Sequence, residues 1–378
     1  MLATRILLSA ALWAAIPISI CAADGDVADL RQQAQAEYNS KNYDKSAGLY
    51  EQILKSAPHD ADALYNAACD YALAGKKEQA VVSLVSAVEN GFVNFAHLQH
   101  DSDLDSIRSE KGYLELLARR DKILAAYTGK VVAEYQKKLG GDYTVTHDDA
   151  ANVVIISDTD AQTVSQLTQV LQAVSTRLWK SLFKHKPTSE LLVIVPKNVA
   201  DYFQKLGGKK TSAGFYNPGA RTLTVNLATG MGTVVHEFTH GLHYADQEAL
   251  GQQHPQWIVE GLGALYEQSG MGDGQMTGAI NWRLPILKKA IADKKTFPLK
   301  DFLAKSNEYF AKDVSVAYAM TRYVCYFLQE KKLLLRFYEK YCVQYDQDKS
   351  GVHTLEEVYG KPVDEFEKDW LEFVGTLH

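Results

Sequence analysis

Two histidines four residues apart, with a glutamate directly after the first, constrain this chain more than any other feature. His236, Glu237 and His240 form the pattern His-Glu-x-x-His, and apolar residues flank it on both sides. On an α-helix, residues four apart leave the same face one turn apart, so both imidazoles can bind one Zn²⁺ while the glutamate reaches a water on the metal. The apolar flanks predict a buried helix. Burying these three polar groups without a metal or other partners would cost free energy.

A second helix, expected after Pro255, offers the third protein ligand that a catalytic zinc site usually has. Glu260 lies in an apolar segment twenty positions after His240, which leaves enough chain to turn and bring a second helix beside the first. The small residues Gly261 and Gly263 would let the two helices approach closely. We therefore expect His236, His240 and Glu260 to hold Zn²⁺.

Asp246 is the alternative third ligand. In the metzincin pattern a third histidine follows the second by six positions, beyond a glycine that breaks the helix. Asp246 occupies that position here, and His243 stands where the glycine would be. Without the glycine we expect the helix to continue and to carry Asp246 away from the metal. His243 is then expected beside the metal ligands or on the surface.

The two segments HEFTH and PQWIVEGLGALYE together resemble the gluzincin metallopeptidases, and most closely the peptidase MA-like family, in which the second helix supplies a glutamate ligand. The resemblance covers roughly residues 141–345. It includes the segments 213–216 and 221–227, similar to the family's hairpin before the zinc helix, and 318–323, similar to a later helix. Gly263 stands where alanine is commoner. The resemblance implies a zincin-like fold, bound Zn²⁺ and hydrolysis of peptide bonds.

Roles for further residues follow from this chemistry and from the resemblance. Glu237 would be the general base toward the attacking water. Tyr318, by its place in the family-like helix, would donate a hydrogen bond to the developing oxyanion. Glu267 either orients a ligand histidine or is a surface carboxylate. The resemblance also implies that strand 222–227, with its alternating polar residues, is the edge to which an extended substrate adds.

Two other functions stay open at this point. The protein could be an exported scaffold that binds a partner through its N-terminal repeats, with a structural or weakly active zinc domain. The site could instead hydrolyse a non-peptide amide. The presence of Glu237 favours catalysis over the scaffold, because a purely structural zinc site has no use for a general base.

The N-terminus has the pattern of a secretory signal peptide. Arg5 precedes an apolar run that extends to Ile20, and small residues follow up to Ala23, after which we expect cleavage. Lipidation of Cys21 is the alternative, and the bulky Ile20 before it disfavours this. No other stretch has 18 consecutive apolar residues, so we expect an exported protein, periplasmic or secreted, without a membrane span in the mature chain.

Residues 27–119 have the period of tetratricopeptide repeats, which are helical pairs of 34 residues. Tyr38 aligns with Tyr71, and Ala47 with Ala80, each at an offset of 33. A third, degenerate unit is expected from Phe95 to Arg119. Stacked units of this kind form a concave surface for a peptide or protein partner, or they stabilise a neighbouring domain.

The whole chain is predicted to be an α+β protein with a zincin-like domain of a small mixed sheet, the zinc helix and a helical C-terminal part. Its net charge of −6 argues against a nucleic-acid partner. The glycine-rich segment 269–278 is expected to be a loop and 299–310 a single helix. Cys325 and Cys342 are expected either to pair or to stay as buried thiols. The expected parts are a signal peptide (1–23), the tetratricopeptide-like domain (24–125), a helical linker (126–141) and the zinc metallopeptidase domain (142–378).

Overall fold

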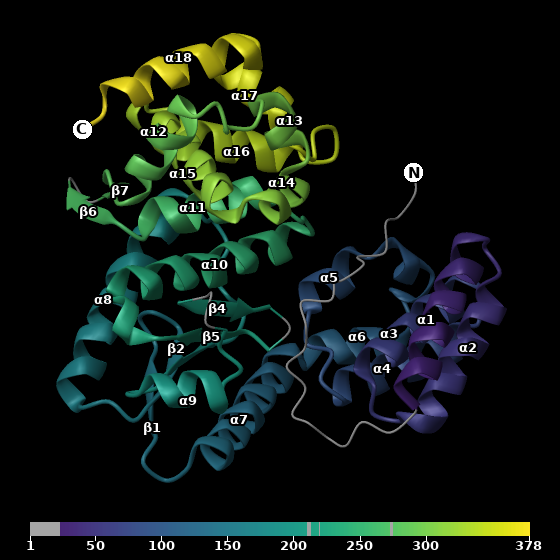
Figure 1. Cartoon of the computed structure of the whole chain (residues 1–378). Coiled ribbons are helices and arrows are strands. Elements are labelled where there is room, and N and C mark those ends of the chain that lie inside the picture. The colour runs from purple at the N-terminus through teal and green to yellow at the C-terminus, as the bar shows by residue number, and fades with distance from the viewer. Residues whose placement is uncertain (1–22, 210–212, 219, 273–274) are drawn as a thin grey trace. The chain divides into compact units, whose positions relative to one another are not determined.

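The computed structural model describes residues 23–209, 213–218, 220–272 and 275–378. It divides into two compact units, and the division falls at Gly129 inside helix α7 (Arg120–Leu139) (Figure 1). The predicted signal peptide lies outside the described residues except for Ala23, which begins helix α1. Within the described ranges, no helix has both the length and the apolar character needed to cross a membrane.

The N-terminal unit is built from antiparallel helix pairs in a repeat-like order. Tyr38 and Tyr71 are both buried, as are Ala47 and Ala80, so the residues at an offset of 33 take the same place in successive pairs. Asp60 caps the N-terminus of the first helix of the second pair, where its side chain accepts a hydrogen bond from the backbone N–H of Ala63. The elements are α1 (Ala23–Asn39), α2 (Tyr43–Ser56), α3 (Ala61–Leu73), α4 (Lys77–Glu89), α5 (Phe95–His100), the 3₁₀ helix η1 (Ser102–Ile107) and α6 (Lys111–Ala118).

The second unit contains a mixed sheet with the strand order β1-β2-β3-β5-β4. The central strands β2, β3 and β5 run parallel, and each outer strand is antiparallel to its neighbour. Strands β2 and β3 are apolar and buried along almost their whole length, as expected where both faces of a sheet are covered. The strands are β1 (Thr144–Asp148), β2 (Val153–Ser157), β3 (Leu191–Val195), β4 (Gly214–Asn217) and β5 (Thr222–Val225).

Strand β5 is an interior strand, which corrects the expectation that 222–227 forms the edge of the sheet. It pairs with β3 on one side and with β4 on the other, for example through Leu223, which faces Val193 and Tyr216. Its threonines Thr222 and Thr224 are buried. Their alternation with apolar residues predicts one polar face, but threonine is small enough to pack inside a covered sheet. Among the described strands, β4 is the one at this edge.

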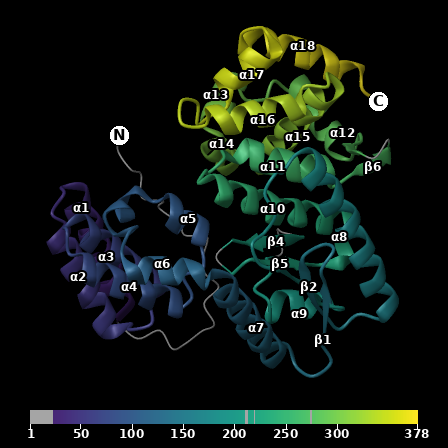
Figure 2. The same cartoon turned by 180° about the vertical axis from the view of Figure 1, so that it is seen from behind.

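Helix α10 (Met231–Leu250) lies between the sheet and a layer of C-terminal helices, and α9 (Val199–Gln204) lies on the opposite face of the sheet (Figures 1 and 2). Helix α8 (Ala161–Ser181) also contacts α10. Helix α11 (Gln256–Tyr266) packs against α10 on one side and against α15 (Val314–Glu330) on the other.

The C-terminal part differs from the sequence predictions in two places. Residues 269–272 and 275–278 pair as two antiparallel strands, where a loop was expected. Segment 299–310 is divided into two helices at Lys305, which has a non-helical backbone conformation. Cys325 and Cys342 are free thiols, so the pairing considered for them is not formed. The remaining elements are β6 (Ser269–Gly272), β7 (Gln275–Gly278), α12 (Arg283–Ala292), α13 (Leu299–Ala304), α14 (Ser306–Lys312), α16 (Leu334–Gln344), α17 (Val352–Tyr359) and α18 (Val363–Thr376).

Candidate metal centre

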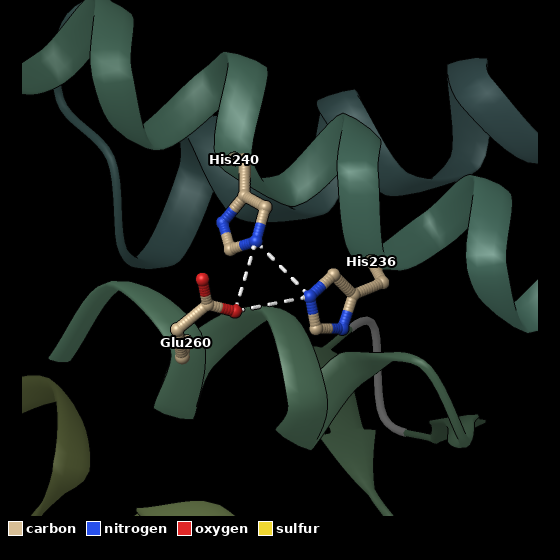
Figure 3. A group of neighbouring side chains, drawn as sticks. All are labelled: His236, His240 and Glu260. Atoms are coloured by element: carbon tan, nitrogen blue, oxygen red, sulfur yellow. Dashed lines mark hydrogen bonds and ion pairs between the residues drawn. The ribbon is translucent and has the colours of Figure 1, made fainter. Parts of the chain in front are cut away.

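His236, His240 and Glu260 point their polar atoms at one another across the interface of α10 and α11 (Figure 3). The two Nε2 atoms are 3.0 Å apart, and Glu260 Oε2 lies 3.3 Å from each. Both histidines come from one face of α10, which continues without a break from Gly230 to Gly251. The three side chains are no more than 16% exposed. The two helices thus place three potential ligand atoms at one buried point.

These residues fit a zinc ion. A tetrahedral Zn²⁺ with ligand bonds of about 2.0–2.1 Å holds neighbouring ligand atoms about 3.3 Å apart, close to the three distances between these side chains. At 3.0 Å the two Nε2 atoms cannot both carry a proton, so at least one of them directs a lone pair at this point. Burial lowers the pKa of His236, but hydrogen bonds to Glu260 and Glu267 raise it to about 10. The surroundings therefore favour a positive charge at this point.

Glu267 anchors the far side of His236. Its carboxylate lies 3.2 Å from His236 Nδ1, accepts two hydrogen bonds from Arg283 at 2.9 and 3.0 Å, and accepts one from Asn281 Nδ2 at 2.7 Å. Burial raises the pKa of Glu267, but the hydrogen bonds from His236 and Arg283 outweigh this and lower it to about 2. A carboxylate that holds the Nδ1 proton leaves Nε2 free for a metal. Of the two possibilities considered for Glu267, the structure therefore supports the orienting one.

Gly263 lets the backbone of α11 approach the two imidazoles. A Cβ at this position would lie 2.8 Å from His240 Cε1 and 3.1 Å from His236 Nε2. Gly261 has a different role from the one expected, because its missing Cβ would meet Cys325 Sγ of α15 at 2.6 Å. The two glycines thus open opposite sides of α11, one toward the candidate metal ligands and the other toward the C-terminal helices.

Glu237 is buried beside this centre, under the edge strand β4. A Cβ on Gly214 would lie 2.8 Å from Glu237 Cγ, so the strand passes very close to the side chain. Burial raises the pKa of Glu237, and the charge of Glu260 adds to this; the two histidines and a hydrogen bond from the Tyr216 backbone partly offset it. A carboxylate of raised pKa is a stronger base, which suits proton transfer near neutral pH.

Helix α15 brings Tyr318 to the same centre. Its ring centre is 6.1 Å from that of His236, and its hydroxyl is close enough to Glu260 for that charge to act on it. Burial raises the pKa of this hydroxyl far above its ordinary value, and the negative charge of Glu260 raises it further. Tyr318 therefore stays protonated and can donate a hydrogen bond.

Asp246, the alternative third ligand, lies outside the group of converging atoms. It accepts hydrogen bonds from the backbone N–H groups of Lys184 and His185, each at 2.9 Å, and from the Tyr338 hydroxyl at 2.8 Å. Asp246 thus joins α10 to the segment after α8. The unbroken helix carries it away from His236 and His240, as the absence of a glycine predicted.

His243 occupies neither of the two expected environments, because it is fully buried in an aromatic cluster. Its Nε2 lies 2.8 Å from His254 Nδ1, and its ring stacks on Phe183 with centres 5.1 Å apart. Sequence reasoning failed here because His254 and Phe183 reach this site only through the folding of distant segments.

Tyr244 was missed from the sequence, although its position on the helix could have revealed it. It follows His240 by one turn and so lies on the face of α10 that carries both histidines. Its ring stacks on that of Tyr216 from the edge strand, with centres 5.3 Å apart. Burial raises the pKa of Tyr244, and the charges of Glu260 and Glu237 raise it further. Asn281 and Arg283 were missed as well, and no sequence pattern marks them.

Comparison with known proteins gives little guidance to the function of this site. No protein-family model matches the chain. Among curated proteins it is similar to a chloroplastic protein of Arabidopsis thaliana, with 30% identity over 97 residues. The match covers 25% of this chain and 29% of the Arabidopsis protein. The similarity therefore spans less than a third of that relative's length and establishes no family for the chain as a whole.

Proposed function

We propose that this chain is a zinc-dependent metallopeptidase whose second unit is a zincin-like domain of the gluzincin, peptidase MA-like type. The observation that carries the proposal is the convergence of His236 Nε2, His240 Nε2 and Glu260 Oε2 at one buried point. Glu237, directly after the first ligand, adds a base of raised pKa at the same place. Three protein ligands and a nearby base are the composition of a catalytic rather than a structural zinc site.

Each side chain of the candidate centre has a separate role in the proposed hydrolysis. When bound, Zn²⁺ would supply Lewis-acid polarisation and lower the pKa of a water to about 7. Glu237 removes a proton from the attacking water and passes it to the leaving amine. Tyr318 presents a protonated hydroxyl to the substrate oxygen that becomes negative. Glu267 keeps His236 in the tautomer that a ligand needs.

Strand β4 is the element that would bind an extended peptide. It is the outer strand at this edge of the sheet, and Gly214 and Tyr216 lie directly against Glu237. A peptide added to this edge by main-chain hydrogen bonds would place its carbonyl groups beside the base. This assignment replaces the expectation for strand β5.

The remaining parts of the proposal concern location and partners. The pattern of residues 1–23 supports export, with the mature protein periplasmic or secreted. The repeat-like helical pairs of the N-terminal unit support a protein partner for that unit.

The test is the metal content and peptidase activity of the mature protein, residues 24–378. Wild type is expected to bind one zinc per chain and to cleave members of a peptide library. Glu237→Gln should keep the zinc and lower kcat by about 10²- to 10⁴-fold, because it removes only the base. Glu260→Ala should weaken zinc binding. Glu115→Gln, an exposed glutamate of the first unit, is the matched control.

Two outcomes would overturn the proposal. If Glu237→Gln cleaves peptides as fast as wild type, Glu237 is not the base. If wild type binds no metal under any loading condition, the site is not a metal centre, and the scaffold function becomes the better account of the chain.

A further inference from the structure

Trp282 is a large aromatic residue that stays 61% exposed next to the candidate metal centre. It lies between the β6–β7 hairpin and α12, and its neighbour Arg283 links it to the centre. The guanidinium carbon of Arg283 is 4.2 Å from the ring centre of Trp282 and 4.7 Å from that of Tyr318. One guanidinium group therefore contacts both the exposed indole and the ring of Tyr318, which lies beside His236.

The backbone around Trp282 is held firmly, so its exposure is not that of a loose surface side chain. On one side, Asn281 donates to Glu267, and its backbone N–H bonds to the Tyr323 hydroxyl. On the other side, Arg283 makes a two-pronged ion pair with Glu267, and its backbone N–H bonds to Asn281 Oδ1. Both neighbours of Trp282 are thus tied to the carboxylate that orients His236.

A second exposed apolar residue lies one helical turn from Tyr318. Val314, at the start of α15, is 56% exposed and precedes Tyr318 by one helical turn, so it leaves the same face of the helix. Val314 is thus joined to Tyr318 along the helix, and Trp282 is joined to it through Arg283. A large indole left exposed close to buried, converging polar groups is a candidate contact for a ligand.

We propose that Trp282 forms an apolar subsite that selects an aromatic or large aliphatic side chain of the peptide substrate. The proposal rests on the proposed function and deepens it. An aromatic or aliphatic group can pack on the open surface of the indole, and aromatic pairs add a geometric preference. The Arg283 guanidinium already makes a cation–π contact with the ring, which leaves less of the ring's attraction for a lysine or arginine side chain. Because Asn281 and Arg283 are held by hydrogen bonds, the backbone at Trp282 is already ordered, and the protein loses less conformational entropy when a ligand binds.

The experiment is a cleavage screen of a peptide library. In this library each position around the cut bond is occupied in turn by phenylalanine, leucine, alanine or lysine. Mass spectrometry gives kcat/KM for each peptide with wild type, Trp282→Ala and Trp282→Phe. Val343→Ala on α16 is the matched control, because this residue is 84% exposed and lies outside the site. Zinc content is measured for all four proteins.

Wild type is expected to prefer phenylalanine or leucine over alanine at one position near the cut bond. Trp282→Ala should reduce this preference, the ratio of the two kcat/KM values, by about tenfold or more. Trp282→Phe should restore most of the ratio, and Val343→Ala should leave it unchanged. Zinc content should be the same in all variants, which separates a lost subsite from a damaged metal centre.

The preference ratio decides between the possible outcomes. If Trp282→Ala keeps the wild-type ratio, or slows all peptides equally, the subsite is wrong while a peptidase that depends on Glu237 still stands. If wild type cleaves no peptide, or cleaves as well with Glu237→Gln, the proposed function fails and the subsite fails with it.

Discussion

Glu267 shows at the scale of one residue how a candidate ligand histidine is held in the second unit. Its two carboxylate oxygens reach His236, Arg283 and Asn281 at the same time. Without it, the His236 Nδ1 proton would lose its acceptor and Arg283 would lose its ion pair. The geometry of one candidate metal ligand therefore depends on a residue that does not itself reach the metal position.

Glu267→Ala is expected to weaken zinc binding by about 10- to 100-fold, the usual effect of removing the partner of a ligand histidine. Zinc affinity can be measured by titration against a competing chelator. Glu372→Gln, an exposed glutamate on α18, serves as the control. An unchanged affinity in Glu267→Ala would mean that this carboxylate does not orient His236.

At the same scale, the burial of His254 predicts how the free energy of unfolding depends on pH. Burial lowers its pKa to about 3, and that of its partner His243 well below the ordinary value of 6.5. Its neighbours Tyr341, Tyr345 and Gln252 are uncharged. Both histidines are therefore neutral in the folded protein, whereas in the unfolded chain each takes up a proton below about pH 6.5.

The free energy of unfolding should therefore fall as pH drops from about 6.5 toward about 3, by as much as about 1.4 kcal/mol per pH unit for each histidine. In His254→Gln this slope should be smaller, although the variant is less stable overall. Urea unfolding of both proteins at several pH values gives the two slopes. Equal slopes would show that His254 already carries a proton in the fold, or that it is not buried.

Helix α11 illustrates at the scale of an element how glycine controls helix packing. Gly263 lies against the two histidine rings of α10, and Gly261 lies against Cys325 of α15. Two positions apart on a helix, they face in nearly opposite directions. The helix can therefore contact both neighbours closely while Glu260 stays at the candidate metal centre.

Gly263→Ala should move α11 away from α10, because its new Cβ would lie 2.8 Å from a ring carbon of His240. The shift separates Glu260 from the histidines, so zinc affinity is expected to fall while the protein stays folded. Gly129→Ala in α7 is the control, since a Cβ there meets nothing within 4 Å. If chelator titration gives equal affinities for both variants, the contact between α11 and the histidines is looser than the structure indicates.

At the scale of the whole molecule, the two units have separate hydrophobic cores. Leu84 is fully buried in the core of the N-terminal unit, and Leu171 in that of the second. Outside residues 1–23, all tryptophans lie in the second unit: Trp179, Trp257, Trp282 and Trp370. Tryptophan fluorescence therefore reports on the second unit alone, whereas circular dichroism reports on the helices of both.

Leu84→Ala should lower the free energy of unfolding of the N-terminal unit by about 2–5 kcal/mol, because it leaves a cavity in that core. In urea unfolding, its circular dichroism transition should shift while the fluorescence midpoint and the zinc content stay the same. Leu171→Ala should shift the fluorescence midpoint instead. A shift of both signals by Leu84→Ala would mean that the units unfold as one.

The amino-acid sequence by itself determined the features that depend on neighbouring residues. The spacing of His236 and His240 placed both imidazoles on one helical face, because the helix period is a local property of the backbone. The 33-residue offset between Tyr38 and Tyr71 predicted the helical pairs of the first unit. The lack of a helix-breaking glycine at His243 correctly predicted that α10 continues and carries Asp246 away from the candidate metal centre.

Only the tertiary structure decided which distant segments meet. Arg283 and Asn281 belong to no motif, and their contacts with Glu267 and Tyr318 form where α12 packs against α15. The interior position of β5 likewise depends on the order of strands in the sheet. The alternation of threonines with apolar residues could not predict it, because these threonines are buried although their pattern is typical of an exposed face. Local patterns specify helices and strands, whereas the pairing of distant segments depends on packing summed over the whole unit.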